Sequence, residues 1–129
     1  MPDEPKRPSK EPIVFERRKF TRIDASYMVS YTDVTHGEPR SDLSQTKNIS
    51  MGGILFITDR EYSPGTVLRV RLRIPDAPDY INAKVQVVIS RQKIKGMMYD
   101  TSVKFIAVRE EDREVIRKLI ESRLKNKKG

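Results

Sequence analysis

The feature that most constrains this chain is a two-residue alternation of apolar and polar side chains that returns in successive short segments. It is strictest in residues 67–75, VLRVRLRIP, and it recurs in residues 25–34, ASYMVSYTDV, and residues 80–90, YINAKVQVVIS. Alternation of this kind is typical of strands that bury one face and leave the other in solvent. Such strands must pair around a shared core, so the pattern favours a mainly β protein.

Six segments are expected to form strands, with turn chemistry such as THGEPRS and Pro64-Gly65 between them. The segments are residues 25–34, 42–49, 54–58, 67–75, 80–90 and 99–108. The short apolar run ILFIT is typical of a strand that is buried on both faces. The inward faces of the last two segments are expected to carry Ile81, Ala83, Val85, Val87 and Ile89, and Tyr99, Thr101, Val103 and Phe105.

The period changes in residues 109–128, where apolar side chains recur at helical spacing. They are Val115, Ile116, Leu119, Ile120 and Leu124. Acidic residues in the first turn and basic residues near the end suit the helix dipole, although Arg109 stands at the N-cap in place of a good capping residue. The pattern predicts a small six-stranded antiparallel β-barrel with a C-terminal α-helix that covers one open end or side.

The chain has 129 residues, which is the length of one domain. Residues 1–14 are expected to form a flexible tail, residues 15–124 the domain with IVFERRKFTRID as an irregular lead-in, and residues 125–129 a basic tail. No apolar run is long enough to span a membrane, and the first residues do not resemble a secretory signal. We therefore expect a soluble, cytoplasmic protein.

The residue types that catalysis or metal binding would need are scarce. The only histidine, His36, lies in a turn-like segment, and there is no cysteine, no metal-ligand spacing and no phosphate-binding loop. We therefore expect neither an enzyme nor a metal or cofactor site. The net charge of +8 instead favours an anionic partner, which could be a nucleic acid, a nucleotide, an anionic lipid or an acidic protein surface.

Arginines cluster in ERRKFTRI, just before the first expected strand. Arg18 and Arg22 are four residues apart, and Arg17 precedes them. A guanidinium group can grip phosphate oxygens, or the O6 and N7 edge of guanine, with two parallel hydrogen bonds, and its flat face can stack on a purine. Taken alone, however, a basic run of this kind is usually a solvated segment.

A second group lies in NISMGGILF, where a polar stretch meets an apolar one. Asn48 offers a donor and an acceptor, and Ser50 offers a hydroxyl. Gly52 and Gly53 allow a flat or charged group to come close to the backbone. Taken alone, the same residues fit a tight turn between two strands equally well.

Together, an Arg-x-x-x-Arg motif before the first strand and an Asn-x-Ser-x-x-Gly motif about one strand pair later resemble the two-part signature of the PilZ domain family. The resemblance extends from about Phe15 to about Leu124 and includes the Pro-Gly turn, the YDTSVKF strand and the C-terminal helix in the family's order. It implies the barrel-and-helix fold that the alternation predicts. It also implies a bacterial receptor for cyclic di-GMP, a second messenger with two guanines and two phosphates on one ring.

The resemblance also implies roles for individual residues. Arg18 and Arg22 match the arginines that grip phosphate and guanine in the family. Asn48 and Ser50 match the polar pair that contacts a guanine edge and neighbouring groups. Gly53 matches the glycine that allows close approach.

Two further positions bear on the details of binding. Arg17 stands where the family's residue is thought to influence whether one ligand or a stacked pair binds, and an arginine is compatible with a stacked pair. Ser102 departs from the family pattern, which often has glycine before the Val-x-Phe of the last strand. The Ser102 side chain puts the fine geometry of a nearby strand or of the ligand's rim in question.

A ligand held by both groups is expected to pull the flexible arginine lead-in onto the rigid barrel, a disorder-to-order change that creates a new surface. The protein would then act as an adaptor on an unidentified effector protein, as a monomer or a homodimer. Motility, adhesion and exopolysaccharide production are the usual outputs of the family, and nothing in the sequence selects one of them.

Two alternatives stay open. A basic small barrel could follow a nucleic-acid backbone through Arg69, Arg71 and Arg73, but the face lacks a row of aromatic residues for base stacking, so we do not expect a nucleic-acid partner. A PilZ-like scaffold could also work through protein contacts without any ligand, although this chain keeps both motifs.

Overall fold

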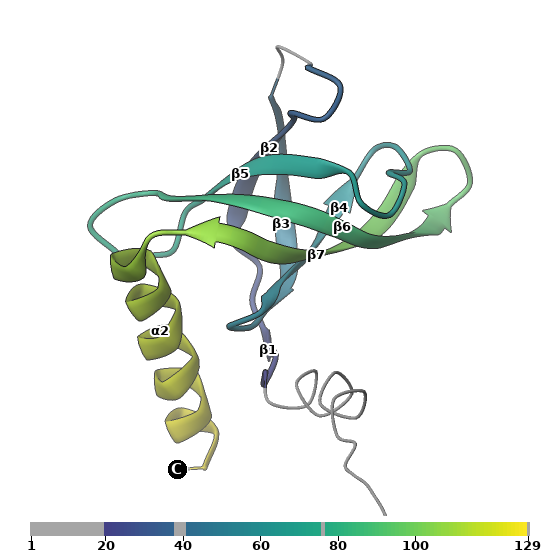
Figure 1. Cartoon of the computed structure of the whole chain (residues 1–129). Helices are drawn as coiled ribbons and strands as arrows, with labels where there is room; N and C mark the ends of the chain where they lie inside the picture. The colour runs from purple at the N-terminus through teal and green to yellow at the C-terminus, as the bar shows by residue number, and fades with distance from the viewer. Residues whose placement is uncertain (1–19, 38–40, 76, 129) are drawn as a thin grey trace, which may run out of the picture.

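The computed structural model describes residues 20–37, 41–75 and 77–128 (Figure 1). In that part of the chain it contains seven strands and one helix. In chain order they are β1 (Ile23–Asp24), β2 (Met28–Asp33), β3 (Asp42–Ile49), β4 (Gly53–Thr58), β5 (Val67–Leu72), β6 (Ile81–Ile94), β7 (Met98–Val108) and α2 (Glu110–Lys128). Each of the six expected strands is present, and the lead-in contributes the short strand β1.

The strands form a closed antiparallel barrel. The order around it is β3, β2, β5, β6, β7 and β4, and β4 pairs with β3 to close the ring. β1 pairs with β3 at Ile23–Ile49 and Asp24–Asn48, next to the stretch of β3 that pairs with β2. The expected six-stranded barrel with a C-terminal helix is confirmed. The lead-in is more regular than expected because β1 continues the line of β2 along β3.

The inward side chains of the alternating strands fill the barrel. Those that are at most 1% exposed include Val29, Phe56, Leu68, Val70 and Val85. The ring of Tyr31 meets that of Phe56 edge to face, with the ring centroids 5.1 Å apart. Helix α2 lies beside the barrel and packs Ile116 and Ile120 into the same core, as its apolar spacing predicts (Figure 1).

The helix begins as the sequence indicates, with Arg109 at the N-cap. The Arg109 carbonyl accepts a hydrogen bond from the Arg113 N–H at 3.0 Å, which is the first bond of the helical ladder. The Arg109 guanidinium in turn lies 3.3 Å from the buried carboxylate of Asp112. Asp112 therefore holds the residue that precedes the first turn.

Two expectations about burial were wrong. Ile89 is 39% exposed because the β6–β7 register shifts between the Val87–Val103 and Ile89–Ser102 pairs, which turns Ile89 to the outer face. The run 54–58 is not buried on both faces: its inward residues are buried, but Leu55 is only half-buried. A barrel has one core, so the other side of its wall faces outward.

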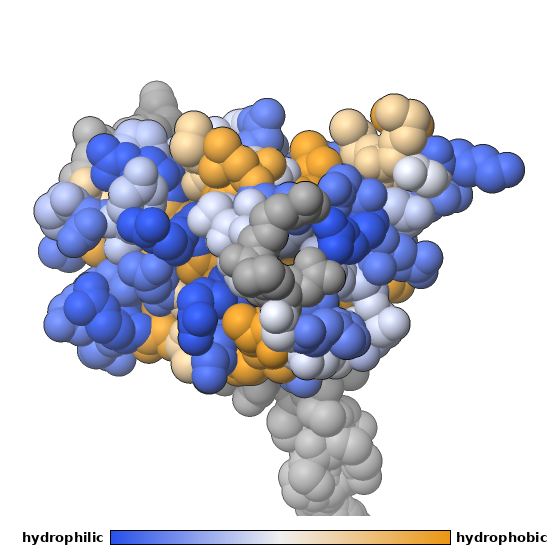
Figure 2. All heavy atoms as spheres, turned by 90° about the horizontal axis from the view of Figure 1, so that it is seen from above, coloured by the Kyte–Doolittle hydropathy of each residue, from blue (hydrophilic) through white to orange (hydrophobic). Residues whose placement is uncertain are grey.

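Strands β6 and β7 extend past the other strands as a hairpin (Figure 1). Its turn contains Gly96 with a φ of 69°, a conformation that favours glycine. Figure 2 views the molecule from the side on which β2 and β5 lie in Figure 1, and there hydrophobic side chains form separate areas among hydrophilic ones. No helix in the described ranges is long and apolar enough to cross a membrane.

Candidate ligand-binding site

The connection between β3 and β4 is a tight corner that Ser50 holds together. The Ser50 hydroxyl accepts hydrogen bonds from the backbone N–H groups of Gly52 and Gly53, at 3.1 and 3.2 Å. The Ser50 N–H donates to the Gly53 carbonyl at 2.9 Å. The side chain is only 7% exposed, so its main contacts are within the corner itself.

The two glycines of the corner are each in close contact with another part of the chain. A β-carbon on Gly53 would lie 1.9 Å from the carbonyl oxygen of Val103, so only glycine fits where β4 meets β7. A β-carbon on Gly52 would lie 3.0 Å from the ring of Phe20. The sequence suggested that something approaches this backbone closely, and within the chain it is β7 and an aromatic ring that do so.

Strand β1 brings the arginine lead-in to the same corner. Because Ile23 pairs with Ile49 and points inward, its neighbour Arg22 points outward at the level of Ser50. Arg22 is exposed. Arg22 thus directly precedes β1 at the end of β3 from which the corner begins, whereas Arg17 and Arg18 lie outside the described residues.

Asn48 lies on the outer face of the barrel, beside the corner. A register shift between Thr46 and Asn48 lets two successive residues, Lys47 and Asn48, stand between the buried Thr46 and Ile49. Asn48 is half-buried and lies between Asp24 of β1 and Leu55 of β4. The bulge therefore presents a cation and an amide side by side.

Ser102 lies on this outer face too. It pairs with Leu55, which itself pairs with Asn48, so Ser102 is two strands away from the amide. It is half-buried. The Ser102 side chain therefore lies on the outer face and is not part of the close contact between Gly53 and β7.

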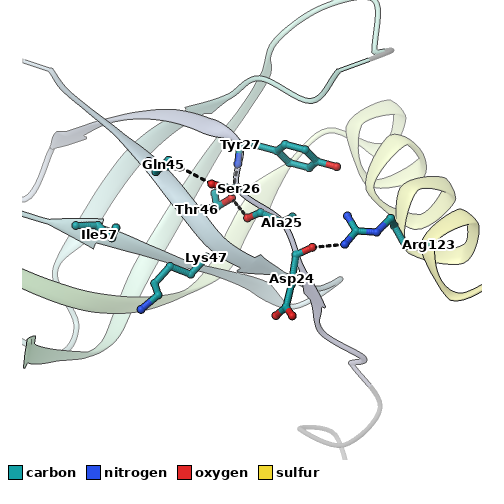
Figure 3. A pocket seen from close by; sticks show the side chains of 9 residues that line it. All are labelled: Asp24, Ala25, Ser26, Tyr27, Gln45, Thr46, Lys47, Ile57 and Arg123. Carbon is teal, nitrogen blue, oxygen red and sulfur yellow. Dashed lines mark hydrogen bonds between the residues drawn. The ribbon is translucent and has the colours of Figure 1, made fainter. Parts of the chain in front are cut away.

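An open cleft of about 610 Å³ lies on the same side of β3 as Lys47, but none of the site residues predicted from the sequence lines it (Figure 3). It lies between the β1–β2 connection, β3 and the C-terminal helix. Its lining residues are Asp24, Ala25, Ser26, Tyr27, Gln45, Thr46, Lys47, Ile57 and Arg123. Arg123 reaches from α2 and donates a hydrogen bond to the Asp24 carbonyl, while Lys47 lies 3.0 Å from the carboxylate of Asp100.

The cleft adds two cations that the sequence analysis did not single out. Lys47 adjoins Asn48 in the sequence, but nothing in the pattern shows that a bulge presents both side chains outward. Arg123 lies 99 residues from its partner Asp24, so only the fold brings it to this side of the barrel. The charged residues that line the cleft are Lys47, Arg123 and Asp24, and the charge of Lys47 is paired with that of Asp100.

The titratable groups with a displaced pKa lie away from this cleft. Burial raises the pKa of Tyr62 in the core to about 12. Burial alone would raise the pKa of Asp33, but hydrogen bonds from His36 outweigh it and hold that pKa below its ordinary value. His36 is an exposed turn residue, as expected, and the described residues include no group of three or more His, Asp or Glu that could hold a metal ion.

Comparison with solved structures gives the same barrel. The Bacillus subtilis inhibitor of motility MotI/DgrA has a TM-score of 0.74 at 20% identity, over 88% of this chain and 54% of that one. The K. pneumonia MrkH–c-di-GMP complex has a TM-score of 0.68 at 20% identity, over 87% and 54%. The PilZ domain of Escherichia coli YcgR with c-di-GMP has a TM-score of 0.60 at 17% identity, over 88% and 99%.

This chain therefore spans about half the length of the first two structures. No curated protein sequence matches it. The family model of the PilZ domain matches residues 16–122, which include both motifs, the barrel and most of the helix. The chain belongs to the PilZ domain family.

Proposed function

We propose that this protein is a receptor for cyclic di-GMP. The observation that supports the proposal is the β1–β3 pairing of Ile23 with Ile49 and of Asp24 with Asn48, because Arg22 directly precedes β1 and Ser50 directly follows β3. Solved relatives of the same fold, MrkH and YcgR, are complexes with c-di-GMP. The ligand's phosphates and guanine edges are the groups that arginine forks and an amide recognise.

The binding residues have different tasks in this proposal. Arg18 and Arg22 grip phosphate and guanine, and Asn48 donates to and accepts from a guanine edge. An arginine at position 17 is compatible with binding of a stacked pair of ligands. Ser50 acts chiefly by shaping the corner, since its hydroxyl already accepts two backbone N–H groups and lies 3.3 Å from the Gly53 carbonyl.

The glycines also act through shape. Gly53 lets β4 and β7 meet behind the corner, and Gly52 leaves room for the ring of Phe20. Both keep the corner compact enough for Arg22 and Asn48 to face the same ligand. Their contribution to binding is therefore indirect.

The proposed ordering of the arginine segment is narrower than the sequence suggested. Residues from Phe20 to Asp24 already lie against the barrel through the Gly52 contact and β1. Ordering on binding would therefore concern Arg17, Arg18 and the residues before them. A ligand can drive it only by as much as it prefers the closed arrangement.

The ligand-bound surface would then act on a protein partner. We propose an adaptor in the bacterial cytoplasm, monomeric or dimeric, that carries no catalytic activity of its own. Lead-in, ligand and barrel would together form a surface that the free protein does not present. Such a change is what allows a messenger to control a partner's activity.

Titration calorimetry with cyclic di-GMP tests the proposal. Loss of a desolvated arginine contact costs about 2–5 kcal/mol, so Arg22→Ala should weaken binding by some tens-fold to thousands-fold. Lys118→Ala on α2 removes the same charge from another surface and serves as the matched control. Cyclic di-AMP should bind far more weakly. The proposal is wrong if the wild-type protein binds neither nucleotide, or if both variants bind cyclic di-GMP like the wild type.

A further inference from the structure

Four cations gather on the outer face of β5 and β6. They are Arg69, Arg71, Arg73 and Lys84, here called the basic strip, and all four are exposed. Around the closed barrel, β5 is three strands from β4 in either direction. The basic strip therefore lies on the wall opposite the Asn48 corner and does not belong to the candidate cyclic di-GMP site.

The charges of the basic strip are not compensated within the described part of the chain. Arg117 of the helix, by contrast, binds both Glu114 and Glu121. No carboxylate of the described residues lies within ion-pair distance of the strip. Moreover, Arg69 and Lys84 stand directly opposite each other across β5 and β6, and like charges in that position are destabilising.

Residues that make unfavourable contacts without a structural gain are commonly functional. The repulsion between Arg69 and Lys84 therefore points to a binding role. An anion placed between Arg69 and Lys84 would replace this repulsion with two attractions. The strip also has one ordered element: the Arg71 guanidinium stacks on the Tyr80 ring at 4.2 Å, and that of Arg73 lies 5.6 Å from it. Because this stacking already restricts the Arg71 side chain, Arg71 loses less conformational entropy when it binds a ligand.

The cross-strand neighbours of Arg69 and Arg71 are polar. Arg69 pairs with Thr32 on the β2 side, and Arg71 lies between Ser30 and Asn82. Exposed apolar surface begins at the end of the strip, at Met28 of β2, whose carbonyl accepts a hydrogen bond from the Arg73 N–H at 2.9 Å. Asp79, the acidic residue next to Tyr80, accepts a hydrogen bond from the Tyr80 N–H at 2.9 Å.

We propose that the basic strip binds the phosphate backbone of a nucleic acid, independently of sequence. Protein partners usually bring an apolar core to an interface, whereas nucleic-acid interfaces are polar and strongly positive, as the surroundings of Arg69 and Arg71 are. Alternate residues of a strand stand roughly 6.6 Å apart, so Arg69 and Arg71 of β5, with Arg73 just after it, can contact successive phosphates of a flexible single strand. This reverses the expectation from the sequence, which could not show that Lys84 opposes Arg69.

Fluorescence anisotropy of a labelled thymidine 20-mer, titrated with the full chain at several salt concentrations, tests the proposal. Four phosphate contacts to a single strand predict a slope of log K against log salt of about −2.8. Removing two of them with Arg69→Gln and Lys84→Gln together should reduce the magnitude of the slope by about 1.4. The affinity at low salt should fall about two- to thirty-fold.

The matched control removes the same charge from the helix, with Lys118→Gln and Lys125→Gln together, and should leave the slope nearly unchanged. The thermal midpoint of the Arg69→Gln, Lys84→Gln variant should equal or exceed that of the wild type, because a repulsion is removed. A lower midpoint with an unchanged slope would assign the pair a structural role and overturn the proposal.

Three other results would also overturn it. One is the absence of binding by the wild type at low salt. Another is an equal loss of affinity in the two double variants, which would reflect net charge alone. The third is displacement of the oligonucleotide by poly-glutamate as readily as by unlabelled oligonucleotide at equal charge, which would point to an acidic protein instead. None of these depends on cyclic di-GMP binding.

Discussion

Gly53 lies against Val103 so closely that a β-carbon on the glycine would stand 1.9 Å from the Val103 carbonyl oxygen. It would also lie 2.9 Å from the α-carbon of Lys104. Both neighbours are backbone atoms of β7, which is held in the sheet by the β4–β7 ladder. The glycine that the PilZ signature contains is therefore required by the packing of the barrel, whatever the site binds.

Gly53→Ala should destabilise the protein. Replacing glycine by alanine where there is room stabilises by about 0.4–1 kcal/mol, but here the methyl group would force two backbones apart, and overpacking costs typically about 1–3 kcal/mol. We expect the clash to win and the free energy of unfolding in urea to fall by about 2 kcal/mol. Circular dichroism of the unfolding transition measures it.

Gly52→Ala is the comparison, because the same methyl group there meets only the exposed ring of Phe20, at 3.0 Å. The ring can move aside, so we expect a change in stability within about 1 kcal/mol. Equal stability of the two variants would contradict the assignment of Gly53 to the β4–β7 contact.

The fold could be predicted because the apolar positions of the alternating strands are the side chains that fill the core. Residues 67–72 alternate between exposed arginines and buried aliphatic side chains, as expected of a wall with one core. The pattern failed where the ladder is irregular. The bulge beside Ile89 turns that side chain outward, and bulges depend on the register between strands, which one strand's sequence does not show.

The site was predicted less completely than the fold. The family motif predicts that Arg22 and the Ser50 corner act together, and the β1–β3 pairing joins the residues next to them, Ile23 and Ile49. Periodicity alone did not show that pairing, because a two-residue strand leaves no pattern. The sequence also could not predict the contact of Arg123 with Asp24, because the two residues lie 99 positions apart in the chain.

Asp33 fixes the turn after β2 through its contacts with His36. The Asp33 carboxylate is buried, lies 2.7 Å from His36 Nδ1 and accepts the His36 N–H at 3.1 Å. Because the folded pKa is held below the unfolded value of 3.8, the ionised carboxylate stabilises the fold above that value. The stabilisation is lost as the pH falls through the lowered folded pKa.

Asp33→Asn should therefore reduce stability most at neutral pH. The difference in the free energy of unfolding between wild type and variant should shrink as the pH falls below 3.8 toward the folded pKa. Urea unfolding at a series of pH values measures this difference. Asp79→Asn, an exposed carboxylate, is the control. A wild-type–variant difference that stays constant from neutral pH to acid would show that the charge of Asp33 is not involved.

Arg123 connects the last helix to the start of the barrel. Its guanidinium donates to the Asp24 carbonyl, and β1 and α2 are in contact (Figure 3). β1 has only two residues, so its place beside β3 depends on such contacts. The next residue, Ala25, donates its N–H to the Lys47 carbonyl at 3.1 Å, and this bond reports on how firmly the lead-in is held.

Arg123→Ala should loosen this segment without unfolding the barrel. Loss of one hydrogen bond of about 0.5–1.5 kcal/mol predicts hydrogen exchange at the Ala25 amide that is about two- to tenfold faster, measured by NMR. Arg117→Ala is the matched control: it removes an arginine from the same helix, but one whose partners, Glu114 and Glu121, are also helical. If both variants change exchange at Ala25 to the same extent, the effect comes from a weaker helix and the Arg123–Asp24 contact does not hold the lead-in.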